Sequence, residues 1–159
     1  MTTIAYKDGV IAADSRETHE TEAGGSTKHV CAKLFRKTVG EGRKAYEVIL
    51  ATAGESSPGM IFVDWYGTGK EVPRMLLDRD PDFTCLILTP QGLFEADEYC
   101  RPVERSETAY AIGSGRKEAL AAMSCGKSAV EAVRIAAIHD PYTGGRVHSM
   151  RLNEAKKRA

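Results

Sequence analysis

Apolar and polar residues alternate along the first part of the chain, which predicts β-strands. Residues 2–7 and 10–15 are rich in β-branched and small apolar side chains, and the Asp8-Gly9 pair between them is a strong hairpin signal. The polar stretch 17–29 contains Gly24-Gly25-Ser26 and predicts a long, mobile loop. The chain is therefore expected to open with a hairpin followed by a flexible segment.

The same alternation predicts six further strands, at residues 33–38, 47–53, 83–89, 93–96, 108–112 and 146–152. The polar, glycine-bearing stretch 39–44 joins the first two of these strands. The turn 90–92, Pro-Gln-Gly, makes the next two a hairpin.

Three segments have a helical pattern. Residues 56–66 begin with serines that can cap a helix, carry a proline near the first turn and end before Gly67. Residues 115–125 are rich in helix formers and stop at Gly126. A capping box from Ser128 to Glu131 opens a third helix that runs to about Ile138. Strands, helix, strands, helix pair and strand follow in this order, which predicts an α+β fold with antiparallel sheets.

Composition indicates one water-soluble domain over residues 1–152, followed by a charged tail over 153–159. The chain has 159 residues, of which 42% are hydrophobic and 28% charged. Lys+Arg and Asp+Glu both count 22, so the net charge is zero. This balance gives no electrostatic reason to expect a nucleic acid or an anionic membrane as a partner.

The chain lacks an apolar run of about 18 residues and a secretory signal pattern, so a cytoplasmic location is expected. The cysteines are widely spaced, which suits reduced thiols. The four histidines have no metal-ligand spacing, so neither a metal nor another cofactor is expected.

Thr2 is the first candidate for chemistry. Because threonine is small, we expect Met1 to be cleaved, which leaves a free α-amine on a residue that carries a hydroxyl. Such an amine has a pKa of about 7.7–8.0, so it can serve as the base that activates the hydroxyl. A Met-Thr start is common, however, and does not define an enzyme by itself.

The register of the first hairpin decides which residue faces Thr2. A three-residue loop with Gly9 in the left-handed conformation would set Thr2 opposite Asp14, whereas a two-residue turn would pair Thr2 with Ser15. The first register puts a carboxylate on the same face as Thr2, where it could hold a cation against the hydroxyl. The alternative for Asp14 is a strand-end aspartate that binds local backbone.

At this point the sequence resembles a known family, the proteasome β subunits and the bacterial HslV-type peptidases. Five segments carry the resemblance in the family's order: Thr2-Thr3-Ile4, the run 10–16 (VIAADSR), Lys33-Leu34 with the strand that ends at Gly54, the run 111–115 (AIGSG) and the run 140–145 (DPYTGG). The resemblance implies a four-layer αββα sandwich with a cleft at the start of the first strand. It also implies subunits that stack into rings and enclose their threonines in a chamber.

Carried over residue by residue, the resemblance implies that the hydroxyl of Thr2 is the nucleophile and that its own amine accepts the proton through water. Lys33 would lower the pKa of the nucleophile by its charge, and Asp14 would hold that charge in place. The backbone N–H of Gly54 would be the oxyanion donor. The alternatives are an ordinary strand lysine at 33 and a plain turn glycine at 54.

Ser114, Asp140 and Thr143 would form the hydrogen-bonded group that orients the Thr2 amine. Thr143 stands where the family more often has serine, and the hydroxyl is retained. Ser114 could instead cap a helix, and Asp140 could end one, because a residue before proline avoids the helical conformation. Arg16 is expected to brace Asp14 or the loop beside it.

Substrate side chains would contact Cys31, Thr52 and Glu55 or Ser56, which flank Gly54 and the Lys33 strand; this mixed set indicates no preference. The chain departs from the family between Trp65 and Phe83. The family continues its first helix there and adds a second, whereas Gly67, Gly69, Pro73 and Pro81 predict a loop or short turn. These helices help to join rings in the family, so ring size and stacking are left open.

The leading hypothesis is a self-compartmentalised threonine endopeptidase that acts on peptides or unfolded proteins, as a homo-oligomeric ring fed by an ATP-dependent unfoldase. Two alternatives stay open. One is a small-amide hydrolase on the same scaffold, which needs no chamber. The other is a non-catalytic, ring-forming subunit, against which the set Thr2, Asp14, Lys33, Ser114 and Asp140 argues.

Overall fold

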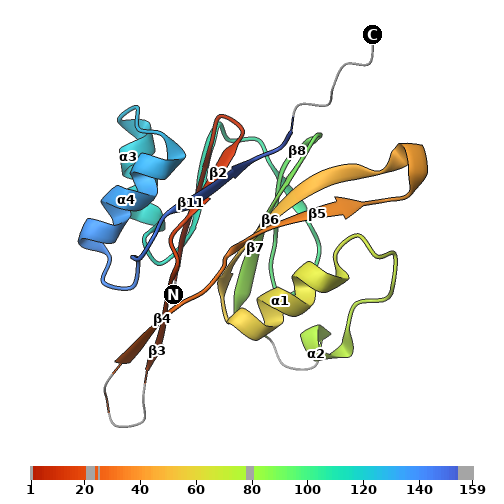
Figure 1. Ribbon diagram of the computed structural model, residues 1–159, viewed down its shortest axis with the longest axis horizontal. Coiled ribbons are helices and arrows are strands. Elements are labelled where there is room, and N and C mark those ends of the chain that lie inside the picture. The colour runs from red at the N-terminus through yellow and green to blue at the C-terminus, as the bar shows by residue number, and fades with distance from the viewer. Residues whose placement is uncertain (1, 21–23, 25, 78–80, 154–159) are drawn as a thin grey trace.

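Two antiparallel sheets form the centre of the fold in the computed structural model, which describes residues 2–20, 24, 26–77 and 81–153 (Figure 1). The first sheet has the order β10-β1-β2-β11 and consists of Ala109–Gly113, Thr3–Lys7, Val10–Ala13 and His148–Arg151. The second has the order β5-β6-β7-β8-β9 and consists of Leu34–Val39, Tyr46–Gly54, Phe83–Thr89, Gly92–Ala96 and Val103–Arg105. The predicted α+β class with antiparallel sheets is confirmed.

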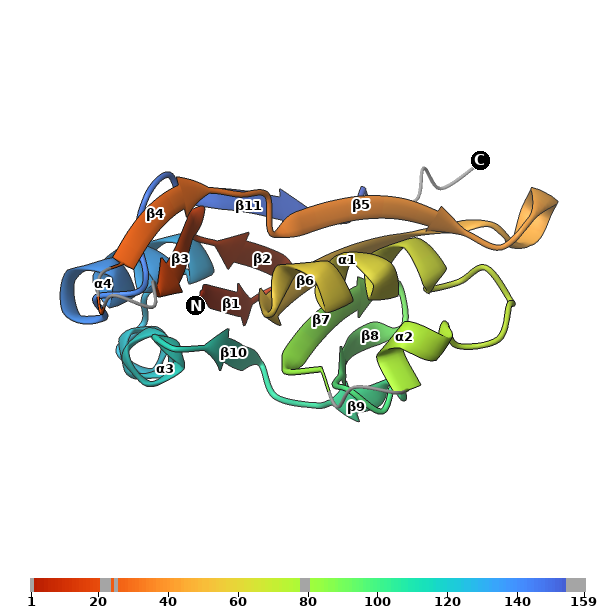
Figure 2. The ribbon, with the colours of Figure 1, turned by 90° about the horizontal axis from the view of Figure 1, so that it is seen from below.

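Helices cover the two sheets on opposite sides of the molecule (Figures 1 and 2). They are α1 (Ser56–Trp65), α2 (Arg74–Leu77), α3 (Arg116–Ser124) and α4 (Ala129–His139). Alanines of β1, β2 and β10 pack against α3 and α4, while the aromatic Phe62 of α1 packs against Phe83 of β7. Between the sheets lies a third cluster, with Ile4, Ile49 and Leu86 fully buried. Each sheet therefore buries both of its faces.

The first hairpin turns through two residues. Lys7 pairs with Val10, and both Asp8 and Gly9 have positive φ angles, 51° and 76°, as a type I′ turn requires. The three-residue loop that would set Thr2 opposite Asp14 is therefore wrong. The observed register instead brings the N–H of Asp14 to the carbonyl of Thr3, at 3.2 Å.

The mobile loop predicted for residues 17–29 is also wrong for its described part. Arg16–Glu20 (β3) and Ser26–Val30 (β4) pair as a two-stranded ribbon that projects from the body of the protein (Figure 1). All of β4 is exposed. Because neither face of such a ribbon packs on a core, its strands lack the apolar alternation that identifies a strand in sequence. Residues 21–23 and 25 lie outside the described residues.

The remaining elements follow the predicted order, with local differences. The turn after β7 contains only Pro90 and Gln91, since Thr89 pairs with Gly92, and β9 was not predicted. The capping box at Ser128 is confirmed. The serine cap predicted for α1 is wrong, because Glu55 occupies the N-cap without a side-chain bond and the Ser56 hydroxyl donates to Glu17 instead.

A short helical turn, α2, stands in the connection for which a loop or short turn was predicted, of which residues 78–80 lie outside the described residues. No helix within the described ranges has both the length and the apolar character needed to cross a membrane. In the C-terminal tail, only Asn153 is described.

Candidate active site

Thr2 lies directly before β1 and lines two cavities. The larger cavity, of about 310 Å³, is lined by Thr2, Lys33 and Gly54 among others, and the smaller, of about 190 Å³, by Thr2, Gly54 and Ser114. Thr2 is 5% exposed. The structure thus brings the predicted nucleophile, the predicted lysine and the predicted oxyanion donor around one space.

The main chain of Thr2 is held by the turn between β10 and α3. The Thr2 carbonyl accepts a hydrogen bond from the Ser114 N–H at 2.8 Å. Gly113 makes this approach possible, because its φ is +92° and a Cβ there would lie 1.8 Å from the Thr2 oxygen. Only glycine fits this position without backbone movement.

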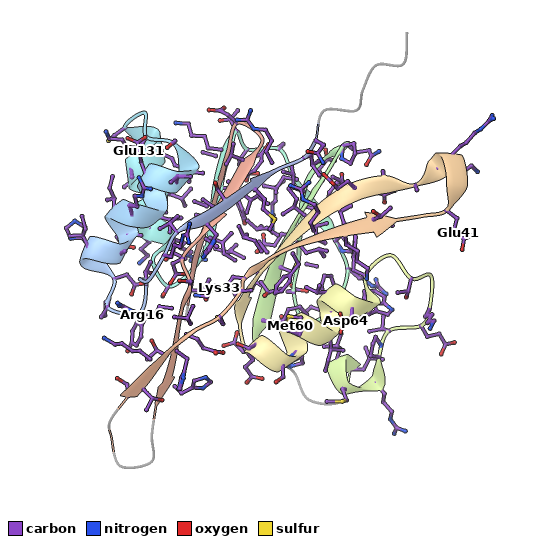
Figure 3. All side chains as sticks on the ribbon, viewed as in Figure 1. Arg16, Lys33, Glu41, Met60, Asp64 and Glu131 are labelled. Carbon is purple, nitrogen blue, oxygen red and sulfur yellow. The ribbon has the colours of Figure 1, made fainter. Side chains whose placement is uncertain are left out.

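Asp14 and Lys33 form a buried ion pair beside Thr2. Lys33 Nζ lies 2.8 Å from Asp14 Oδ1, and the two side chains are 4% and 0% exposed. Lys33 Nζ also donates to the Arg16 carbonyl at 2.5 Å, at the base of the ribbon (Figure 3). A charge pair withdrawn from water to this degree needs further hydrogen bonds to be tolerated.

Backbone amides supply those further bonds to Asp14. Its Oδ1 also accepts from the Thr3 N–H at 3.0 Å, and its Oδ2 accepts from the N–H groups of Arg16 at 3.2 Å and Gly144 at 2.9 Å. Asp14 therefore binds local backbone and holds the Lys33 ammonium at the same time. The sequence left open whether Asp14 holds a cation or binds local backbone, and in the structure it does both.

Asp140, Ser114 and Thr143 form a second hydrogen-bonded cluster. Asp140 Oδ2 accepts from Ser114 Oγ at 2.6 Å and from Thr143 Oγ1 at 2.5 Å, and Oδ1 accepts from the Tyr142 N–H at 3.2 Å. Burial alone would raise the pKa of Asp140, but these hydrogen bonds outweigh it and lower the pKa. The carboxylate thus stays ionised at neutral pH and acts as an acceptor only.

Ser114 does not cap α3, because Gly115 occupies the N-cap position. Its hydroxyl proton points to Asp140, so the oxygen lone pairs of Ser114 remain free to accept from a donor at Thr2. Asp140 does end α4, as the C-cap residue. It therefore combines the helix-ending role with the cluster role.

Thr3 extends this cluster and was missed by sequence reasoning. Thr3 Oγ1 lies 2.5 Å from Thr143 Oγ1 and accepts from the Gly115 N–H at 3.1 Å. Because the Thr143 proton is committed to Asp140, Thr3 must be the donor to Thr143. Its side chain is fully buried on β1. Only the position of Thr3 directly after Thr2 pointed to it, and the cluster partners lie more than 100 residues away.

We expect Thr3→Val to lower the free energy of unfolding by about 1–3 kcal/mol, because the Gly115 N–H loses its acceptor and the Thr143 oxygen its donor in a buried site. Thr3→Ser keeps both hydrogen bonds and serves as the matched control. Urea unfolding at fixed protein concentration measures the difference. A larger loss in Thr3→Ser, which removes only the methyl group, than in Thr3→Val would mean that packing of the methyl group, rather than the hydroxyl chain, is what matters.

Arg16 joins the two clusters. Its guanidinium donates to the carbonyl of Thr143 at 3.1 Å and to that of Pro141 at 3.4 Å, while its backbone N–H donates to Asp14. Gly144 packs directly beneath the guanidinium, where a Cβ would lie 2.3 Å from the central carbon. The predicted bracing role of Arg16 is thus confirmed, and it extends to the 140–145 turn.

Gly54 lines both cavities with its backbone. The neighbouring Glu55 N–H donates to the Asp82 carbonyl at 2.7 Å, so in the alternating antiparallel ladder the Gly54 N–H points away from β7. The pairing with β5 stops at Ala51. Gly54 has a φ of +95°, and a Cβ would lie 2.3 Å from the Asp82 oxygen. Only a glycine therefore fits at this point of the cavity wall without backbone movement.

The residues expected to contact substrate, Cys31, Thr52 and Glu55, line the larger cavity together with Ser56. Burial raises the pKa of the Cys31 thiol, which disfavours its thiolate form. Four further lining residues were not predicted: Glu17, Ala32, Phe35 and Met60. The sequence gives no signal for Glu17, because the polar stretch 17–29 predicts a loop rather than the strand β3.

Among the residues that the structure describes, no group of three or more His, Cys, Asp or Glu side chains is arranged to hold a metal ion.

This fold is that of the proteasome-like N-terminal-nucleophile hydrolases. Eukaryotic HslV from Trypanosoma brucei matches 96% of this chain with 99% of its own, at a TM-score of 0.64 and 16% identity. BPH from Thiobacillus denitrificans in complex with epoxomicin matches 96% of this chain with 99% of its own, at 0.62 and 23%. Anbu (ancestral beta-subunit) from Yersinia bercovieri matches 94% with 80% of its own chain, at 0.69 and 13%.

No protein-family model and no curated protein sequence matches the chain. At 13–23% identity, these solved structures establish the fold. The chemistry rests on the residues of this chain.

Proposed function

We propose that this protein is a threonine-type endopeptidase whose nucleophile is the hydroxyl of Thr2, exposed together with its α-amine by removal of Met1. One observation carries the proposal above the others. A lysine and an aspartate form a buried ion pair beside a threonine at the start of a strand. Such a pair is costly to bury, and a protein that only needed the fold would have no use for it there.

In the proposed acylation step, Thr2 Oγ attacks the carbonyl carbon of the scissile peptide bond while its proton passes to the Thr2 amine. The carbonyl π electrons move onto the oxygen, and the Gly54 N–H stabilises that charge. The Lys33 ammonium favours the ionised Thr2 oxygen, and Asp14 keeps the ammonium in position.

The tetrahedral intermediate then collapses. Its C–N bond breaks, the leaving nitrogen takes the proton from the Thr2 ammonium, and an ester between Thr2 and the acyl half of the substrate remains. Water next attacks the ester, with the amine as base, and the hydroxyl of Thr2 is regenerated. Ser114, held by Asp140 with Thr143, accepts from the Thr2 amine and orients its lone pair.

The assembly belongs to the same proposal. The three buried clusters support a four-layer αββα arrangement, and the likeness to HslV and to Anbu (ancestral beta-subunit) supports a self-assembling homo-oligomer. We propose a cytoplasmic ring that admits peptides or unfolded proteins, with an ATP-dependent unfoldase as its partner.

One observation favours a second candidate, a small-amide hydrolase without a chamber. The connection between α1 and β7 contains only the four-residue helix α2 among its described residues. With so little helix in this connection, the chain has less surface through which rings could stack. A protein that does not form a closed chamber would act on small amides, which need no enclosure.

The test combines three measurements on the native protein. Intact-mass spectrometry should show Met1 removed, a panel of fluorogenic peptides should be hydrolysed, and epoxomicin should block the hydrolysis and modify the peptide that begins with Thr2. Complete retention of Met1 would overturn the mechanism. Light scattering separates the candidates, since a monomer that hydrolyses small amides but not peptides supports the second.

A further inference from the structure

The larger cavity beside Thr2 has a chemically uneven lining. Phe35 and Met60 supply apolar surface, and Cys31 and Thr52 supply small, neutral wall positions. Its charged lining residues are Lys33, Glu17 and Glu55. The charges of this cavity therefore decide which substrate side chain it can accept.

The positive charge in the cavity is already compensated. Lys33 Nζ is paired with Asp14 at 2.8 Å and also bonds the Arg16 carbonyl, and its side chain is 4% exposed. A carboxylate at that distance offsets most of the field of the ammonium. Beyond that pair, the charged side chains that line the cavity are Glu17 and Glu55, and both are acidic.

Glu17 is held in place rather than mobile. Its Oε1 accepts from the Ser56 hydroxyl in the first turn of α1, and its side chain is 21% exposed. The Ser56 hydrogen bond is the main cause that lowers the pKa of Glu17, against the opposing effect of burial. Among the described residues, its one ion-pair partner is the imidazole of His19, at 3.4 Å on a side chain that is 58% exposed.

A third cavity, of about 400 Å³ and open beside the first two, also has acidic residues in its lining, together with His19. It shares Glu17, Gly54, Glu55 and Ser56 with the first and adds Asp82. Three acidic residues, Glu17, Glu55 and Asp82, thus line the cavities that share Gly54. A substrate that crosses Gly54 meets an acidic surface on its way into the first cavity.

We propose that this site is selective for peptides with arginine or lysine immediately before the scissile bond, and that Glu17 is the residue that selects them. The proposal rests on the proposed function. The methylene groups of such a side chain pack on Phe35 and Met60, and its cationic end reaches the anchored Glu17 carboxylate. Glu55 adds to the attraction from the rim.

The first experiment compares fluorogenic peptides that differ only in arginine, lysine, leucine or glutamate before the scissile bond. We expect kcat/KM to favour arginine and lysine over leucine by about tenfold to a hundredfold, as for a charge-assisted hydrogen bond. Glu17→Gln keeps an acceptor for Ser56 and should bring the cationic and leucine peptides within about threefold. Glu17→Lys should reverse the order in favour of glutamate.

Glu41→Gln is the matched control, since Glu41 lies far from Lys33 and Met60 beyond the end of β5 (Figure 3). It should leave the selectivity unchanged. If leucine or glutamate peptides are preferred, or if Glu17→Gln leaves the arginine preference intact, the proposed selectivity is wrong even though the peptidase is real.

A binding measurement separates this failure from failure of the peptidase proposal. In Thr2→Ala, calorimetry should show tighter binding of product-like peptides that end in arginine than of those that end in leucine, and Glu17→Gln should remove the difference. This result supports the cationic site whether or not the native protein hydrolyses peptides. Equal binding of the two peptides overturns it.

Discussion

Thr2→Ala should lower kcat/KM for peptide hydrolysis by at least about 10⁴-fold, because the proposed nucleophile is removed and Lys33, Gly54 and the amine can no longer assist its attack. The fold should survive the change. The anchor of this residue is its main-chain carbonyl, which bonds the Ser114 N–H and is unaffected by the side chain. Alanine is also small enough to permit removal of Met1. Steady-state kinetics with the best peptide of the panel measure the loss.

Thr2→Ser is the matched test of the hydroxyl, because serine keeps the oxygen and the amine and loses only a methyl group. It should retain much of the activity. Thr38→Ala, on an exposed position of β5, is the control and should behave as the native protein. Hydrolysis that persists in Thr2→Ala, with a purified protein free of contaminating peptidases, would assign the activity to another residue.

Asp14→Ala should lower the free energy of unfolding by about 3–5 kcal/mol, because a buried ammonium then stands without its counter-charge. The carboxylate is the acceptor for Lys33 and for the N–H groups of Thr3, Arg16 and Gly144. Activity should fall with stability, since Lys33 loses its position. Chemical denaturation at one fixed protein concentration measures the effect, because assembly also contributes to apparent stability.

The double variant Asp14→Ala with Lys33→Met tests the explanation. Removing both charges should be less destabilising than the sum of the two single changes, since no charge is left buried alone. Lys127→Ala is the control, because its pair with Glu131 is exposed at both ends and should contribute little. Additive effects of Asp14 and Lys33 would show that their pairing is not what stabilises this region.

Local signals explain which parts of the fold were predictable. The capping box at Ser128 and the Asp8-Gly9 turn act within a few residues, and they specify a helix start and a hairpin regardless of context. The register of that hairpin was left open between two turns, because loop length rather than strand composition decides it. The ribbon β3–β4 was missed because its strands, one half-buried and one exposed, consist almost entirely of polar residues and carry no apolar period.

The sequence predicted those residues of the candidate site that belong to the ordered series of family-like segments. Thr2, Lys33, Gly54 and Asp140 stand in segments that occur in the same order as in a known family. Thr3 and Glu17 carry no such signal, because their roles come from partners that are distant in sequence, Thr143 and Ser56. The direction in which the Thr3 hydroxyl donates, and the acidic residues that line the cavity, are known only once the folded structure brings these distant residues together.

The hydrogen bonds around Asp14 also set an order of events in folding. The carbonyl of Thr2 is bound by residue 114, and the carboxylate of Asp14 by residue 144, so the first strand reaches its final geometry only after the last quarter of the chain has docked. Closure of such long loops makes these contacts late ones. Under the proposed function, the site at Thr2 is therefore complete only once residues 114 and 144 have taken their places around it.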